Sequence, residues 1–321
     1  MVRNGRQRGG GESPFKKGQG RKGGDSLYKE VTDRIVREME QGRVPWVQPW
    51  GSTSPALGLP RNAATNRPYG GINILILWSA ATDGGFPGQH WLTFRQALTL
   101  GGHVRKGERG TTVCYADRFT PKAEIERAAR EGGEPDAVPF LKRFTVFNAA
   151  QCEGLPGHLI ASAPVLTERE IVPQAEAVIA ATGADFRIGG DKAFYVPAED
   201  YIRIPPQPAF FQQIDYYRTC FHELGHWTGH PKRLNRDLKG RMGSHPYARE
   251  ELVAEMASAF LCASLGIVPT VRHADYLGAW LEVLREDCRA IFRAASQATK
   301  AADFVLGGRP EAAPERQEAA E

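Results

Sequence analysis

Long apolar runs are missing from this 321-residue sequence. A membrane-spanning helix needs roughly 18 or more consecutive apolar residues, whereas the densest apolar stretch, Ile72 to Ala81, is short and is interrupted by Asn73. Residues 1 to 24 also lack the apolar segment of a signal peptide. We therefore expect a cytoplasmic protein that does not contact a membrane.

Cysteine is scarce as well. The five cysteines, Cys114, Cys152, Cys220, Cys262 and Cys288, show no paired spacing, which argues against a disulfide scaffold. Cys220 and Cys262 have apolar neighbours within predicted helices. Buried free thiols in a reducing compartment are therefore expected.

The folded part of the sequence has no excess of either charge. The net charge of +4 arises from the ends, because residues 1 to 24 carry seven Lys/Arg and one Glu, while residues 307 to 321 carry two Arg and four Glu. We expect both ends to be disordered. The basic, Gly-rich first tail is suited either to non-specific contact with nucleic acid or simply to keeping the protein in solution.

The most informative motif is His222-Glu223-Leu224-Gly225-His226. Apolar residues at helical spacing around it predict a buried amphipathic helix, on which the two histidines project from one face and can share a zinc ion. Glu223 would then act as a general base, accepting a proton from water that the zinc has acidified toward a pKa of about 7. This pattern is typical of zinc hydrolases, most often peptidases.

A hydrolytic zinc site usually has three protein ligands, so a third must come from elsewhere in the chain. The metzincin class is excluded, since Gly229 is present but position 232 is Lys232 and not histidine. A second predicted helix, residues 247 to 261, places Glu251 and Glu255 one turn apart beside its apolar side. Glu251 as third ligand, with Glu255 accepting a hydrogen bond from a ligand histidine, resembles the gluzincin pattern.

Alternatives to this ligand set remain open. Glu250, Glu251 and Glu255 would also suit a solvated acidic helix face. His230 and His245 are rival third ligands, although the predicted helix ends near His230 and turns its ring away. His245 and Tyr247 are also candidates to polarise a substrate carbonyl, as an oxyanion site does.

The first half of the chain combines glycines, basic residues and aromatics. Between residues 61 and 118 there are seven Lys/Arg and three acidic residues. This mixture suits single-stranded nucleic acid, although a small α+β domain with ordinary turns and core aromatics explains it equally well. The candidate DNA-binding residues are Trp46, Trp50, Arg61, Asn62, Arg67, Tyr69, Asn73, Trp91, Arg95, His103, Arg105, Lys106 and Arg109.

The sequence also predicts the helices and strands that carry these motifs. In the first half we predict helices over residues 27 to 39 and 72 to 81, a capped helix start at 91 to 97, and paired strands at 111 to 116 and 144 to 148, with a charged excursion over 120 to 138. In the second half we predict a helix over 168 to 182, a meander of strands at 186 to 188, 192 to 196 and 201 to 205, and one final helix over 276 to 298. The strand at 201 to 205 is a candidate edge strand for binding a substrate backbone, or a plain edge strand.

Two sets of segments resemble a known family. The segments 27 to 50, 59 to 63, 69 to 73, 91 to 97, 102 to 108 and 144 to 154 are similar to the N-terminal domain of ArdC-type antirestriction proteins, and His222 to His230 with Glu250 to Glu255 resembles the zincin-like domain that follows it. The resemblance implies a plasmid or mobile-element protein that binds single-stranded DNA and protects incoming DNA from restriction. The N-terminal domain also occurs in TraC-type primases, but this chain shows no second catalytic module that would support priming.

We therefore predict an α+β protein with a basic tail (1 to 24), an ArdC-like single-stranded-DNA-binding domain (25 to 156), a linker (157 to 164), a gluzincin-like metallopeptidase domain with Zn²⁺ (165 to 306) and an acidic tail (307 to 321). A protein of the host restriction system is the implied peptidase substrate. A DNA-binding protector in conjugation, with a structural and non-proteolytic metal, is the main alternative, and a toxin-like protease without a nucleic-acid role is a third. The sequence does not define the oligomeric state.

Overall fold

A computed structural model of the protein describes residues 19–47, 57–160, 167–240, 243–270 and 276–307. The predicted DNA contact Trp50, and most of both predicted tails, lie outside the described residues. The chain forms two compact units, a larger one of Tyr28–Tyr115 with Lys142–Glu321 and a smaller one of Met1–Leu27 with Ala116–Leu141. The first helix, α1 (Gln19–Glu40), begins six residues before the cap signal at Asp25.

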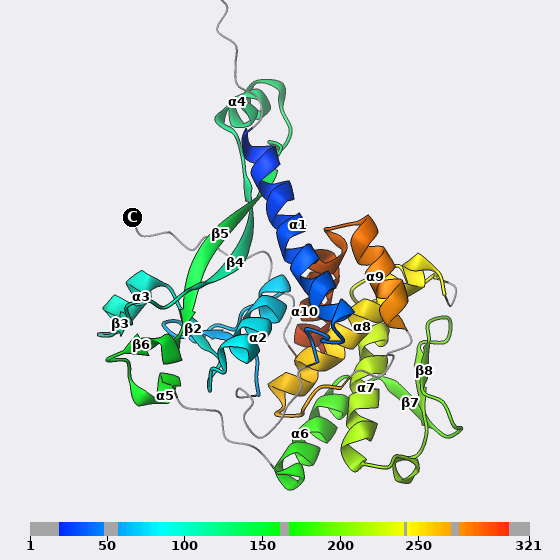
Figure 1. Ribbon diagram of the computed structural model, residues 1–321. Coiled ribbons are helices and arrows are strands. Elements are labelled where there is room, and N and C mark those ends of the chain that lie inside the picture. Colours follow the sequence, from blue (N-terminus) through cyan, green and yellow to red (C-terminus); the bar gives the residue numbers. More distant parts are fainter. Residues whose placement is uncertain (1–18, 48–56, 161–166, 241–242, 271–275, 308–321) are drawn as a thin grey trace, which may run out of the picture. The chain divides into compact units, whose positions relative to one another are not determined.

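A four-stranded sheet organises the first half of the chain (Figure 1). Its order is β1 (Arg61–Asn62), β2 (His90–Leu92), β5 (Val138–Asn148) and β4 (Thr111–Phe119), with β1 parallel to β2 and β2 antiparallel to β5. The pairing predicted for residues 111 to 116 and 144 to 148 is confirmed. Helix α2 (Ile72–Gly84) packs on this sheet, where Leu77 and Ala81 contact Trp91, Val113 and Val146.

Short elements complete this half. Helix α3 (Phe94–Thr99) begins with the reciprocal hydrogen bonds of a capping box between Thr93 and Gln96, as its sequence predicts. A small second sheet pairs β3 (His103–Val104) with β6 (Cys152–Glu153), which follows the short helix η1 (Ala149–Gln151). The predicted excursion contains α4 (Lys122–Glu131), and part of the predicted linker forms α5 (Gly157–Ile160), whose Leu159 packs against the core.

The second half opens with α6 (Glu168–Ala181) and a three-stranded sheet in the order β7 (Asp185–Ile188), β9 (Tyr201–Ile204), β8 (Phe194–Val196). The predicted meander, with residues 201 to 205 as an edge strand, is wrong. Strand β9 is central, parallel to β7 and antiparallel to β8. Its side chains Ile202 and Ile204 are fully buried, and burial of this kind favours a central position over an edge.

The described residues that follow form the short helix η2 (Gln207–Ala209) and then the helices α7 (Gln213–Trp227), α8 (His245–Ser264), α9 (Leu277–Glu286) and α10 (Ala290–Val305). The prediction of a single final helix over 276 to 298 is wrong, since α9 ends at Glu286 and α10 begins at Ala290. Asp287 has an extended backbone, and its carboxylate accepts a hydrogen bond from the Arg289 amide at 2.9 Å. The Arg289 amide therefore bonds a side chain and not a helical carbonyl group, which interrupts the helix at this point. No helix among the described residues is long and apolar enough to cross a membrane.

Helix α8 lies at the centre of the larger unit, packed against α7 on one side and α10 on another (Figure 1). Aromatic pairs connect the two halves of the chain there: Trp78 of α2 meets Phe260 of α8 edge-on at 5.7 Å between ring centroids, and Trp46 meets Trp280 of α9 at 5.6 Å. The helix that carries the candidate third ligand is therefore held by contacts from both halves.

Candidate metal centre

Helix α7 presents His222 and His226 on the side that faces α8. Its apolar face is buried through Ile214, Tyr217 and Phe221, as the sequence pattern predicts. Gly225 lies between the two histidines along the helix, at a place where α8 approaches closely. A Cβ atom there would stand 3.0 Å from the Cα atom of Ala254, so the absence of a side chain permits the close approach of the two helices.

Helix α8 supplies the carboxylates. It begins at a Ser244 cap whose hydroxyl accepts from the Tyr247 amide at 3.4 Å, and it is buried along most of its length. Glu251 and Glu255 are only 3% and 2% exposed. A solvated acidic face therefore does not describe these two residues, because buried carboxylates require charged or hydrogen-bonding partners.

His222, His226 and Glu251 bring three donor atoms together. Their ligand atoms all lie within 4.8 Å of one another. The two Nε2 atoms are 3.2 Å apart, His222 Nε2 is 3.5 Å from Glu251 Oε2, and His226 Nε2 is 3.4 Å from Glu251 Oε1. Zn–N bonds of about 2.05 Å at a tetrahedral angle would separate two donors by roughly 3.3 Å. The three separations therefore fit a zinc-sized ion.

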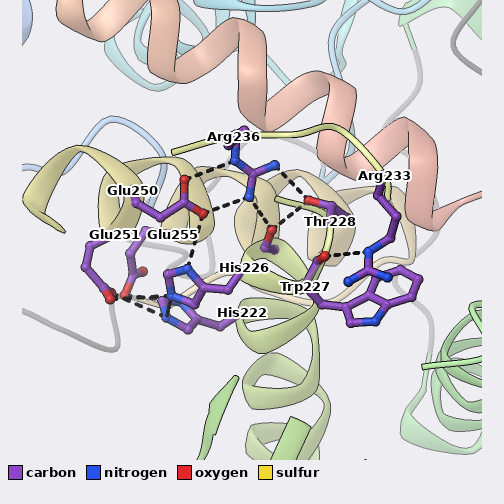
Figure 2. A network of polar contacts seen from close by, with 10 residues as sticks. His222, His226, Trp227, Thr228, Arg233, Arg236, Glu250, Glu251 and Glu255 are labelled. Atoms are coloured by element: carbon purple, nitrogen blue, oxygen red, sulfur yellow. Dashed lines mark hydrogen bonds and ion pairs between the residues drawn. The ribbon is translucent and has the colours of Figure 1, made fainter. Parts of the chain in front are cut away.

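Each histidine also has a carboxylate near its other ring nitrogen. His222 Nδ1 is 3.7 Å from Glu255 Oε1, and His226 Nδ1 is 3.3 Å from Glu250 Oε1 (Figure 2). Ligand histidines commonly have such partners, which fix the ring orientation and the tautomer. Glu255 therefore lies beside His222, a candidate ligand.

The electrostatics of the site match a position for a cation. Burial acts to lower the pKa of His226, but its hydrogen bonds to Glu250 and Glu251 raise that pKa to about 10. Burial acts to raise the pKa of Glu251, but its hydrogen bonds with His222 and His226 hold the pKa well below its usual range. The carboxylates thus stabilise positive charge at the centre of the cluster.

Glu223 lies on α7 directly after His222 and is 4% exposed. Because successive residues on a helix are turned by about 100°, its side chain leaves α7 in a different direction from that of His222, and it does not belong to the donor cluster. This position is compatible with the general-base role that the sequence predicts.

The rival residues lie elsewhere or act through a ligand. The His230 ring is 3.9 Å from Asp200 and accepts from the Lys232 amide at 3.2 Å, while His245 is 3.2 Å from Glu286 and 40% exposed. Neither belongs to the donor cluster. Burial, with hydrogen bonds to Glu251 and Tyr276, raises the pKa of Tyr247, so its phenol stays protonated and contacts the third candidate ligand.

The predicted DNA-binding residues divide into exposed and buried groups. Arg61, Arg67, Arg95, His103, Lys106 and Arg109 are exposed. Trp46 and Trp91 are fully buried, and neither indole is available to a base in this structure, so we assign them to the core.

The remaining predicted DNA contacts have internal partners. Asn62 accepts from two turn amides and donates to Gln96 at 3.2 Å, and Asn73 bonds the backbone of Cys114 on β4. Arg105 pairs with Glu108 at 2.6 Å, and burial raises the pKa of the Tyr69 phenol. These side chains hold turns and strands in place.

Sequence reasoning missed several residues of both regions. Glu250 received no role of its own and Arg236 none at all, although they contact each other at 2.8 Å. The exposed aromatics Phe94, Tyr115 and Phe144 were also missed, and Tyr115 and Phe144 meet edge-on at 5.9 Å across β4 and β5. Alternation along each strand could have found the latter pair, since it puts them on the face opposite to their immediate neighbours.

Comparison with known proteins shows the family to which this chain belongs. Residues 25–147 match the N-terminal domain of anti-restriction factor ArdC, and residues 173–297 match a zincin-like metallopeptidase domain. The crystal structure of metal-free antirestriction protein ArdC from plasmid R388 is 40% identical, with a TM-score of 0.74, over 88% of this chain and 97% of that one. The chain belongs to the ArdC family of antirestriction proteins.

A second crystal structure of ArdC from plasmid R388, in the Mn(II)-bound form, is 39% identical with a TM-score of 0.72 over 88% of this chain and 97% of that one. The predicted α+β architecture, an ArdC-type N-terminal domain followed by a zincin-like domain, is thereby confirmed. The zincin-like domain implies a divalent metal.

Curated sequences extend the family. Uncharacterized protein y4eC of Sinorhizobium fredii is 40% identical over 284 residues, which cover 87% of this chain and 91% of that protein. DNA primase TraC of Escherichia coli is 39% identical over 300 residues, but the match covers only 27% of TraC. An ArdC-like segment thus forms about a quarter of that larger protein.

Proposed function

We propose that this ArdC-family protein binds single-stranded DNA through its N-terminal half and carries a zinc-dependent peptidase site in its zincin-like domain. His222, His226 and Glu251 would hold the zinc, and Glu223 would act as the general base. The observation that carries the proposal is the set of three donor atoms at tetrahedral spacing between α7 and α8.

The residues around the donors have distinct tasks. A bound zinc ion would lower the pKa of water and polarise a carbonyl group. Glu223 would accept the proton that the attacking water loses and return it to the leaving amine. Tyr247 would orient Glu251 through the hydrogen bond that links them. The peptide substrate would belong to the host restriction system.

Zinc is favoured over manganese by the chemistry of the donors. Two imidazoles and one carboxylate are a ligand set found in zinc hydrolases, whereas manganese prefers sites rich in oxygen. The relative described as Mn(II)-bound supports a divalent ion without selecting zinc. Metal analysis of the protein purified without added metal would distinguish the two ions.

A surface near α3 is suited to single-stranded DNA. The hydrogen bond from Asn62 to Gln96 joins the turn that precedes Arg67 to the helix that carries Phe94 and Arg95. Phe94 is 54% exposed and offers a ring face for an unstacked base, while the arginines neutralise phosphates. Tyr115 and Phe144 provide two further exposed aromatic rings.

A second function deserves a test because an ArdC-like segment recurs inside TraC, a protein described as a primase. In that alternative the protein protects DNA by coating it, and the metal is structural. Both functions predict metal binding, so they differ only in whether Glu223 is needed.

The deciding experiment uses Glu223→Gln, which keeps the shape of the side chain but removes its basicity. We expect this variant to retain zinc and to lose cleavage of denatured casein, used as a general peptidase probe, by at least 100-fold. Cleavage that survives would remove Glu223 from the mechanism. In a plating assay against a restricting host, loss of protection would tie antirestriction to the peptidase, and full protection would favour the coating alternative.

A further inference from the structure

Glu250 and Arg236 form an ion pair at the edge of the donor cluster (Figure 2). Arg236 Nε donates to Glu250 Oε2 at 3.0 Å, and Nη2 donates to Oε1 at 2.8 Å. The two parallel hydrogen bonds hold the carboxylate in one plane, which a single bond would not do. The Glu250 and Arg236 side chains are only 11% and 6% exposed, so water screens the pair weakly.

The carboxylate held in this way faces the His226 ring. Glu250 Oε1 is 3.3 Å from His226 Nδ1, within reach of a proton on that nitrogen. A hydrogen bond from Nδ1–H to Oε1 leaves the lone pair of the ring on Nε2. That nitrogen is the one that faces His222 Nε2 at 3.2 Å and Glu251 Oε1 at 3.4 Å.

Arg236 is itself anchored to the end of α7. Its Nη2 also donates to the Gly225 carbonyl oxygen at 2.6 Å, and its Nη1 donates to Thr228 Oγ1 at 2.9 Å. The last carbonyl groups of a helix lack partners within it, and Arg236 supplies one to Gly225. The guanidinium therefore connects the end of α7, the loop after it and the start of α8 around His226.

We propose that the Arg236–Glu250 pair is the positioning element of the metal centre, which fixes the His226 ring with Nε2 toward the ion and so determines how tightly a divalent metal binds. Glu250 would act on His226 as Glu255 acts on His222, so that each ligand histidine has its own carboxylate from α8. This inference rests on the ligand set proposed above.

The test measures the affinity of the full-length protein for Zn²⁺ by competition with a chromophoric chelator. Glu250→Gln and Arg236→Lys should each weaken zinc binding about 10- to 100-fold, the usual effect of losing a partner of a ligand histidine. The double variant should bind no more weakly than the weaker single variant, since the two residues act as one unit. The visible spectrum of the Co²⁺-loaded protein should change in both single variants, because the ligand geometry changes.

Arg233→Lys is the matched control. Arg233 anchors the same loop, through its hydrogen bond to the Trp227 carbonyl oxygen at 2.6 Å and its ion pair with Asp200, but it does not contact His226. A purely structural role for Arg236 would make both lysine variants weaken zinc binding equally. We expect Arg233→Lys to lower the melting temperature and to leave the zinc affinity within about twofold of wild type.

The outcomes separate this inference from the proposed function. If wild type binds no Zn²⁺, the ligand set itself is wrong. If wild type binds Zn²⁺ and Glu250→Gln binds it as tightly, or if Arg233→Lys weakens it as much as Arg236→Lys, the positioning role alone is overturned. Should Arg236→Lys fail to fold, Glu250→Gln and Glu250→Asp, which shortens the side chain by one methylene, decide the question.

Discussion

Arg233 connects the loop after α7 to Asp200, the residue directly before β9. Arg233 lies over the Trp227 ring at 3.8 Å and pairs with Asp200, whose carboxylate also accepts from the Tyr195 hydroxyl at 2.8 Å. The hydrogen bond from Arg233 lowers the pKa of the Asp200 carboxyl group, against the effect of partial burial. Asp200 adopts a left-handed backbone conformation with φ of 58°, which asparagine also tolerates.

We therefore predict that Asp200→Asn destabilises the protein in a pH-dependent way. Because the pKa of Asp200 is lower in the folded state than the unfolded value of about 3.9, its contribution is complete above that value and is lost as the pH falls through the folded pKa. The difference in melting temperature between wild type and variant should be constant from pH 7 to about pH 5 and should shrink below about pH 4.

Melting curves from pH 7 to pH 3 measure this difference. Asp185→Asn is the control, since Asp185 pairs with Arg187 at 3.0 Å on an exposed surface where such pairs contribute little. A difference for Asp200→Asn that stays the same at pH 3 would contradict the assignment of stability to the charged carboxylate.

At the residue scale, the sequence predicts those contacts that depend on the geometry of a single helix. The spacing of His222 and His226 depends only on the helical repeat, and both side chains meet as expected. The task of Glu250 depends on how α8 is rotated about its axis against α7, which the local sequence does not define. Arg236 lies in a loop without periodicity, so its contacts with Gly225 and Glu250 could not be read from the sequence.

At the scale of elements, the α7–α8 contact brings the three candidate ligands together. Gly225 is in helical conformation and needs no unusual backbone; its importance lies in its distance from Ala254. A side chain there would require α8 to shift by a few tenths of an ångström, since the nearest atom is the backbone Cα of Ala254. Glu251, which reaches from α8 to both histidines, would then be displaced.

We predict that Gly225→Ala lowers the free energy of unfolding by about 1 kcal/mol or more, because overpacking typically costs about 1–3 kcal/mol and exceeds the gain in helix propensity. Zinc affinity should fall as well. Gly278→Ala in α9 is the control, since a Cβ atom there meets nothing within 4 Å. This substitution should stabilise α9 by about 0.5–1 kcal/mol through its higher helix propensity. Urea unfolding of both variants measures the two changes; a stabilised Gly225→Ala protein with full zinc affinity would contradict this role for the contact.

The elements that the sequence did not predict have physical causes. The apolar pattern continues from Trp280 to Ile291, but the Asp287 side chain captures a backbone amide and separates α9 from α10. Strand β9 is central because it also pairs with β7, where Asp185 lies opposite Tyr201, 16 residues later in the chain. The sequence of β9 alone does not specify this partner. The buried Trp46 packs edge-on against Trp280, a residue of the other half of the chain.

At the scale of the whole molecule, DNA binding is predicted to belong to the N-terminal half. The full-length protein should bind a fluorescent single-stranded oligonucleotide more tightly than a duplex of the same sequence. Phe94→Ala should weaken the single-strand complex by roughly tenfold through lost stacking. Arg95→Ala should weaken it too, and should reduce the slope of log affinity against log salt by about 0.7 if one phosphate contact is lost.

Arg169→Ala, an exposed arginine at the start of α6 in the zincin-like half, is the matched control and should change neither quantity. Titrations from 50 to 300 mM salt, read by fluorescence anisotropy, distinguish the contributions of stacking and charge. Equal affinity for the two oligonucleotides, unchanged in Phe94→Ala, would assign any DNA contact to charge alone.

The central claim is that α7 and α8 together hold one zinc ion, and native mass spectrometry tests it most directly. The full-length protein, dialysed against excess Zn²⁺ and then against metal-free buffer, should carry one zinc ion per chain. Glu251→Gln, which keeps the size of the third ligand but removes its charge, should carry none under the same conditions. A zinc-free wild-type protein, or a Glu251→Gln protein that retains its full complement of zinc, would contradict the account.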